Sequence, residues 1–309
     1  MNTIAAYTPG HVTGIFHIAD LAEDPLHRGS LGAGFSIDTG VTTRITVLDE
    51  TPGEPVFSIG GIPSADLKVS AALYRHFTES LPDIPAKHLQ IDHIIKPPQG
   101  SGFGTSGAGA LSLALALNQC FGKPFSSEAV AGLAHITEIE CRTGLGTVIG
   151  EFYGGVEIRT APGAPGFGKI VTIPHSRDTR AVFAVRGPYS TSVALSDPEI
   201  RDSVNRAGSA ALKQLQKEPC LKKFQELSRQ FALDTGLCTP WVQSVLHLLE
   251  KKDIVGSMLM FGEAVFALVD TDRVREVESL LRKHGNGGFE EKLLRIFSSA
   301  LNTTGGRYL

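Results

Sequence analysis

The sequence predicts an α+β fold in two domains, and three observations lead to this prediction. The chain has 309 residues, more than a single hydrophobic core usually organises. Strand-like and helical patterns occur in both halves of the chain, with no internal repeat. The segment 161–168 is dense in proline and glycine, which interrupt regular structure. We therefore place a boundary shortly after it and expect domains at 1–175 and 176–309.

The first half of the chain carries clear local signals. It is expected to hold strands over 42–48 and 89–95, a strand pair around 154–160, and helices over 65–77, 110–117 and 126–141. The helix over 110–117 is almost wholly apolar, so it should be buried on most sides. The helix over 126–141 begins at Ser126, whose hydroxyl suits an N-cap, and has Glu128 in its first turn.

The second half is richer in helical patterns. It is expected to hold a strand over 180–186 and helices over 199–215, 221–233, 240–250 and 272–283. The apolar run 258–270 fits either a strand or a buried helix, because periodicity does not separate the two over so short a run.

A glycine-rich stretch over 97–110 follows a strand-like run and leads into the apolar helix. Its glycines are Gly100, Gly102, Gly104, Gly107 and Gly109. Because glycine adopts positive φ and lets the backbone approach a ligand, successive amide N–H groups can converge there on an anion. Thr105 and Ser106 begin the following helix, whose positive end adds to the attraction. The stretch predicts a phosphate site, since a plain linking turn needs only one or two glycines.

Two common phosphate motifs do not fit this stretch. It lacks G-x-x-x-x-G-K-[ST], and its Gly-x-Gly-x-x-Gly spacing lacks an acidic ribose partner after a following strand, so neither a P-loop nor a dinucleotide fold is expected. Instead, the segment from Pro98 to Ala108 resembles the signature loop of the GHMP kinases, P-x-x-x-G-[LF]-G-[ST]-[ST]-[AG]-A.

This resemblance implies a fold, cofactors and site residues. The implied fold has an S5 domain 2-like N-terminal domain, a ferredoxin-like C-terminal domain and an active site in the cleft between them. The implied cofactors are ATP and Mg²⁺, and the nucleotide-binding residues would be Pro98, Gly100, Gly102, Gly104, Thr105, Ser106 and Gly107. By position in the family pattern, Ser106 and Glu138 would be catalytic and would bind the metal, which prefers hard oxygen ligands.

Three further motifs resemble those of the archaeal pantoate kinases, a family within the GHMP kinases. They are P-G-H-V-T-G-I-F within 7–16, D-P-L-x-x-G-S-x-G-A-G within 24–35, and G-G-x-x-x-R-T-x-P-G-A-P-G over 154–166. The resemblance implies ATP-dependent phosphorylation of the terminal hydroxyl of (R)-pantoate to (R)-4-phosphopantoate, a step of archaeal coenzyme A biosynthesis. Relatives of this kind commonly form homodimers, so a homodimer is expected.

Pantoate carries a carboxylate and two hydroxyls, which call for a guanidinium and small polar partners. Arg159 is the leading candidate, because arginine holds a carboxylate in a two-pronged fork. Ser30, His135 and Thr191 are the other candidates for the substrate site, with Thr191 closing it from the second domain. Structural alternatives stay open: Ser30 as a turn residue, His135 as a partly exposed helix histidine and Arg159 as a surface charge. His11 and His17 are expected to be structural, since nothing around them has metal-ligand spacing.

Two positions depart from the family pattern. Thr147 stands where relatives commonly have an aspartate that activates the acceptor hydroxyl or organises the metal, and threonine is no general base at neutral pH. We keep Thr147 among the catalytic candidates. Either the proton leaves without a dedicated carboxylate, or Glu140 or Glu151 substitutes, or activity is reduced. Leu31 stands where an arginine is expected, which would remove one substrate or phosphate contact.

Composition excludes several classes of protein. A net charge of −3 argues against nucleic acid as a partner. The longest apolar run, 108–117, is shorter than the about 20 residues of a membrane span, and the N-terminus does not resemble a signal peptide. The four cysteines form no C-x-x-C pair, so free thiols are expected rather than a zinc site or disulfides. A cytoplasmic enzyme fits these features best.

Two other functions stay open. A GHMP kinase for another small hydroxy acid or amino acid is compatible with Leu31 and Thr147. A catalytically silent protein of the same fold, which binds a nucleotide or metabolite as a sensor, is compatible with Thr147.

Overall fold

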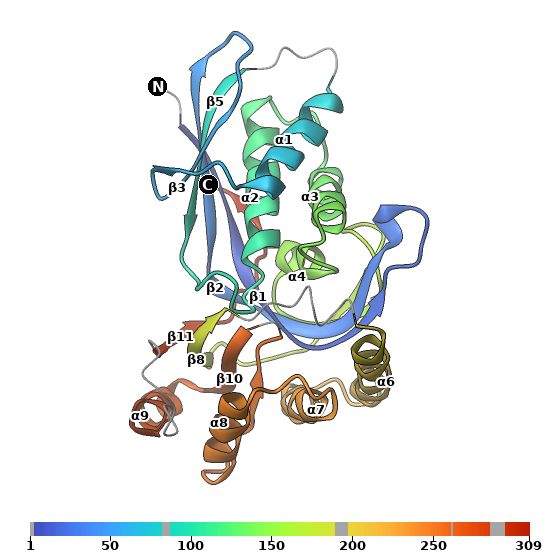
Figure 1. Ribbon diagram of the computed structural model, residues 1–309, viewed down its shortest axis with the longest axis vertical. Helices are drawn as coiled ribbons and strands as arrows, with labels where there is room; N and C mark the ends of the chain where they lie inside the picture. The colour runs from blue at the N-terminus through green and yellow to red at the C-terminus, as the bar shows by residue number, and fades with distance from the viewer. Residues whose placement is uncertain (1–2, 82–86, 189–196, 261, 285–293) are drawn as a thin grey trace.

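The structure is a computed structural model, and it describes residues 3–81, 87–188, 197–260, 262–284 and 294–309. Two β-sheets, each covered by helices, lie one above the other in Figure 1. The arrangement confirms the predicted α+β class. No helix in these described ranges is both long enough and apolar enough to span a membrane.

Two long antiparallel strands, β1 (Thr3–Ala19) and β2 (Gly29–Asp49), form the centre of the first sheet. The other strands of this sheet are β3 (Val56–Ile59), β4 (Ile62–Pro63), β5 (His88–Ile95), β6 (Val156–Ala161), β7 (Lys169–Thr172) and β12 (Arg307–Tyr308). Beginning at β12, the sheet runs β12-β1-β2-β5-β3-β4. The strand expected over 42–48 is only the last part of β2, because the glycine-rich first part gives a weak strand signal.

The two halves of β2 have different neighbours, and this positions the site. Residues 41–49 pair with β5, whereas residues 32–35 pair with β6. The glycine-rich stretch that follows β5 is thereby brought to the same region as the strand that carries Arg159.

Four helices cover the first sheet: α1 (Lys68–Glu79), α2 (Thr105–Cys120), α3 (Ser127–Cys141) and α4 (Thr147–Tyr153). Helix α2 is buried along most of its length, as predicted, and packs against both α1 and α3 (Figure 1). The Ser126 hydroxyl accepts a hydrogen bond from the Ala129 amide and caps α3, also as predicted. The short helix α4 contacts α2, α3 and the middle of β1.

The second sheet runs β11-β8-β10-β9. Its strands are β8 (Thr179–Pro188), β9 (Gly256–Met258), β10 (Gly262–Asp270) and β11 (Arg295–Ala300), and its helices are α6 (Pro198–Leu215), α7 (Leu221–Asp234), α8 (Pro240–Glu250) and α9 (Val274–His284). Single turns of 3₁₀ helix occur at Pro25–His27 and Thr271–Arg273. Most of the ambiguous run 258–270 is strand, because residues 262–270 form β10, which pairs with β8 on one side and with β9 on the other.

Two clusters of apolar side chains form the core. The smaller one joins α2 to the outer part of the first sheet through residues such as Leu111 and Ile91. The larger one joins the middle of β1 and β2 to the second sheet, with Phe35 packed against Phe266 at 5.1 Å between ring centroids.

The division into domains at 1–175 and 176–309 stays a proposal. In its favour, the chain leaves the first sheet after Thr172 and enters the second at Thr179. At the C-terminus, however, β12 returns to pair with β1 of the first sheet. The last residues therefore pack with the first domain as we propose it.

Candidate active site

The glycine-rich stretch forms a tight loop between β5 and α2. Gly100, Gly102 and Gly104 all have positive φ, at 68°, 86° and 63°. A Cβ atom at position 104 would lie 2.6 Å from a carboxyl oxygen of Glu151, and one at position 102 would lie 2.7 Å from the Met260 carbonyl oxygen. Glycine is therefore required at both positions for conformation and for space.

The first turn of α2 follows directly. Gly104 is its N-cap, and no side chain caps the amides of Thr105 and Ser106. Four N–H groups at the start of a helix lack intrahelical partners, and the helix dipole makes this end positive. Loop and helix together form the kind of backbone surface that binds phosphate. Pro98 and the other residues predicted to bind nucleotide lie in this loop or in this first turn.

Ser106 and Glu138 meet across the α2–α3 interface. The Ser106 hydroxyl donates to Oε1 of Glu138 at 2.5 Å, and the Thr143 hydroxyl donates to the same oxygen at 2.6 Å. Glu138 is only 2% exposed. Burial raises the pKa of its carboxyl, and the two hydroxyl donors counter that shift. The structure thus brings together the two predicted oxygen ligands of a metal ion.

Thr147 is the first residue of α4 and lies next to this pair. A Cβ atom added at Gly144 would crowd Oε2 of Glu138 and would lie 3.2 Å from the Thr147 hydroxyl oxygen, so both groups line the same turn. Thr147 therefore lies close to Glu138, the predicted metal ligand.

The two acids considered as substitutes for an aspartate at position 147 lie in different places. The side chain of Glu140 is 51% exposed and pairs with His76 at 3.1 Å. Glu151 is fully buried beneath the glycine loop, and neither of its carboxyl oxygens has a hydrogen-bond partner among the described residues. Burial and then the charge of Glu138 raise the pKa of Glu151 well above its usual value. Of these two acids, only Glu151 lies against the loop.

Ser30 and His135 are both buried. Ser30 is a strand residue of β2, so its interpretation as a turn residue is wrong, and its hydroxyl lies beside Gly146. His135 is 1% exposed, and its Nε2 hydrogen-bonds the Arg28 carbonyl at 3.0 Å, so the partly exposed alternative is also wrong. Burial lowers the pKa of His135, which favours the neutral ring. Thr191 lies outside the described residues.

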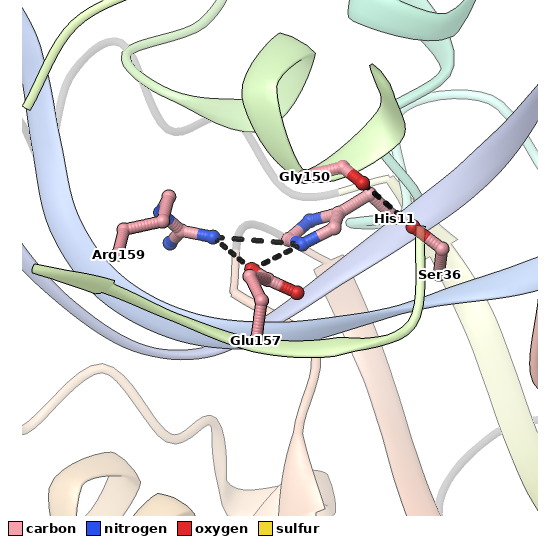
Figure 2. Close-up of polar contacts among 5 residues, drawn as sticks. All are labelled: His11, Ser36, Gly150, Glu157 and Arg159. Atoms are coloured by element: carbon pink, nitrogen blue, oxygen red, sulfur yellow. Dashed lines mark hydrogen bonds and ion pairs between the residues drawn. The ribbon is translucent and has the colours of Figure 1, made fainter. Parts of the chain in front are cut away.

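Arg159 lies buried on β6 rather than on the surface, so its interpretation as a surface charge is wrong. It is 1% exposed, and its Nη1 pairs with Oε1 of Glu157 at 2.5 Å (Figure 2). Nε2 of His11 contacts the same Glu157 oxygen at 2.9 Å. Sequence reasoning did not single out Glu157, although residues two apart on a strand share a face.

Leu31 does not share this face. It lies between Ser30 and Gly32 on β2, so its side chain points to the opposite side of the sheet, where it packs against the larger core cluster. The leucine at this position is therefore part of the apolar packing.

The chain is similar to known proteins in sequence and in fold. Residues 68–155 match the family model of the GHMP kinases N terminal domain. The chain is 32% identical to the pantoate kinase of Thermococcus kodakarensis, across 90% of this chain and 91% of that protein. It is 31% identical to the pantoate kinase of Methanocaldococcus jannaschii, across 89% and 96%. A solved phosphotransferase related to the CoA biosynthesis pathway superposes with a TM-score of 0.87 at 29% identity, across 100% of this chain and 99% of that one.

Proposed function

Because this chain belongs to the pantoate kinase family of the GHMP kinases, we propose that it phosphorylates the terminal hydroxyl of (R)-pantoate with ATP. The product is (R)-4-phosphopantoate, and the reaction is a step of coenzyme A biosynthesis. One observation carries the proposal beyond family membership: the Ser106–Glu138 pair lies at the start of α2, directly after the glycine loop. Phosphoryl transfer depends mainly on such positioning and charge neutralisation.

The glycine loop and the start of α2 would hold the phosphates of ATP. The residues present also fit Mg²⁺, because the Glu138 carboxylate and the Ser106 hydroxyl offer hard oxygens that are hydrogen-bonded to each other. The described residues contain no group of three His, Cys, Asp or Glu side chains that could hold a metal, so nucleotide phosphates would complete the shell. When bound, Mg²⁺ would neutralise charge on the transferring phosphate.

The face of β2 and β6 beside α4 would hold the acceptor. We assign the substrate carboxylate to Arg159 and the substrate hydroxyls to Ser30 and to the neutral ring of His135. Thr191, which lies outside the described residues, stays our candidate for closing this site from the second half of the chain. Thr147 would orient the acceptor rather than remove its proton, because a hydroxyl is too weak a base.

The experiment that tests this function is an ADP-release assay with ATP and Mg²⁺. Pantoate is compared with pantothenate, homoserine, mevalonate and no acceptor. Release with pantoate alone supports the proposal, and loss of release on chelation of the metal supports the role of Mg²⁺. Release with a different acceptor keeps the kinase and discards the substrate. Binding of ATP with no release for any acceptor favours the sensor alternative that Thr147 leaves open.

We also propose that the protein is a cytoplasmic homodimer. Its four cysteines are all free thiols, which suits a reducing compartment. Closed two-fold dimers are the commonest oligomers of soluble proteins. Light scattering coupled to size-exclusion chromatography tests the dimer, and a mass near that of one 309-residue chain would contradict it.

A further inference from the structure

A row of three buried polar side chains lies beside the proposed acceptor site. His11 on β1 and Glu157 and Arg159 on β6 are at most 1% exposed, and they come from positions up to 148 residues apart. Figure 2 shows them as one connected group, in which Glu157 contacts both of the others and Arg159 Nη1 also lies 3.5 Å from His11 Nε2. Burying a guanidinium is costly unless an opposite charge faces it, and Glu157 supplies that charge.

The backbone around this row leaves room for these side chains. A Cβ atom at Gly34 or at Gly150 would lie 2.6 Å from the ring of His11, and a Cβ atom at Gly32 would crowd Nη2 of Arg159. Glycine at these three positions lets β2 and α4 close over the polar row. The His11 amide also donates to the Phe103 carbonyl at 3.0 Å, which ties the row to the glycine loop.

The guanidinium of Arg159 is engaged at one end only. Nη1 is occupied by Glu157, whereas Nε has no hydrogen-bond partner among the described residues. Nη2 lies over Gly32, two residues along the same face of β2 from Ser30. Nε and Nη2 form one edge of the planar group, and such an edge can donate two parallel hydrogen bonds to a carboxylate.

We propose that Glu157, itself held by His11, is a positioning residue that turns the Nε–Nη2 edge of Arg159 toward the carboxylate of the acceptor. The inference rests on the proposed function, because it assigns the acceptor carboxylate to Arg159. It adds the means by which a buried arginine is kept in one orientation, and it makes the His11–Glu157 pair a determinant of selectivity for acceptors with a carboxylate.

The test is a comparison of Glu157→Gln with the wild-type enzyme. We measure kcat and KM for pantoate and for ATP, and the kcat/KM ratio of pantoate to its carboxamide, which lacks the negative charge. We expect KM for pantoate to rise at least tenfold, KM for ATP to stay within twofold, and the ratio to fall at least tenfold. His11→Gln leaves the Arg159–Glu157 pair in place and should shift the same quantities in the same direction by less.

Glu250→Gln is the matched control. Glu250 pairs with Arg229 at 3.0 Å between α7 and α8, so this variant also removes an arginine partner, but in the second half of the chain. It should leave KM for pantoate, KM for ATP and the kcat/KM ratio of pantoate to its carboxamide unchanged. The His11 variant keeps the test decisive if Glu157→Gln does not fold.

Two results would overturn the proposal. One is an equal loss of kcat/KM for pantoate and for ATP that follows the loss of thermal stability. The other is a kcat/KM ratio of pantoate to carboxamide that stays unchanged in both variants. If the wild-type enzyme does not accept pantoate, the proposed function fails, and the ratio is then measured with the acid that it does accept and with the amide of that acid. An enzyme that accepts no carboxylate-bearing acceptor contradicts both proposals.

Discussion

The Ser106 hydroxyl donates a hydrogen bond to Glu138 across 2.5 Å, although the two residues are 32 positions apart in the chain. This contact links the first turn of α2 to the last turn of α3. It places the buried Glu138 carboxyl at the start of α2, where we propose that the nucleotide phosphates bind.

Glu138→Gln tests this relationship. The amide keeps the shape of the side chain but removes its charge, so we expect kcat to fall by about 10²–10³-fold, as for other preorganised charge-stabilising groups. The apparent affinity for Mg²⁺ should fall as well. Glu140→Gln is the control, because Glu140 lies on the same helix with its side chain 51% exposed. Similar losses in the two variants would contradict a metal-binding role for Glu138.

Thr147→Val tests whether the residue in the position of the expected aspartate takes part in proton transfer. A general base contributes about 10²–10⁴-fold to the rate, and a threonine hydroxyl does not act as one. We therefore expect kcat at saturating substrates to fall by less than about tenfold. A loss above 100-fold would show that the hydroxyl itself takes part in the chemical step.

Gly104→Ala tests the glycine loop. Position 104 has a φ of 63°, and an added Cβ atom would lie 2.6 Å from Glu151, so alanine strains the loop in two ways. We expect KM for ATP to rise at least tenfold and the melting temperature to fall. Gly109→Ala is the control, because nothing lies within 4 Å of a Cβ atom there. That change lies in a helix and should stabilise the protein by about 0.5–1 kcal/mol.

Glu151→Gln tests the buried carboxyl beneath the loop by its dependence on pH. Its pKa is well above the usual 4.5 in the folded protein, so above pH 4.5 the folded state holds a proton that the unfolded chain releases. The free energy of unfolding therefore falls as pH rises toward the folded pKa, by about 1.4 kcal/mol for each pH unit between the two values. Glu151→Gln has no carboxyl at this position, so its free energy of unfolding does not fall for this reason.

Denaturant unfolding at pH 4 and at pH 8 measures the difference. We expect Glu151→Gln to be more stable than the wild-type protein at pH 8 and close to it at pH 4. Glu140→Gln, whose carboxyl is half exposed, should show no such gain. If the wild-type protein is at least as stable as Glu151→Gln at pH 8, Glu151 is ionised in the folded state.

Local signals in the sequence predicted much of this structure. The start of α3 after Ser126 follows from capping, and the apolar helix α2 follows from periodicity. Both signals act over a few residues. The glycine loop follows from the restricted conformations of all other residue types. The sequence did not predict the full length of β1 and β2. Their glycines weaken the strand pattern, and the pairing that stabilises the two strands is long-range.

The sequence by itself determined the glycine loop, the helices around it and the family to which the chain belongs. Only the tertiary structure decided which acid lies at the loop, that Ser30 and His135 are buried, and that Glu157 and His11 hold Arg159. The physical reason is that capping and turn formation depend on neighbours in the chain. Burial of a charge and the choice of its partner depend instead on strands and helices brought together from distant positions.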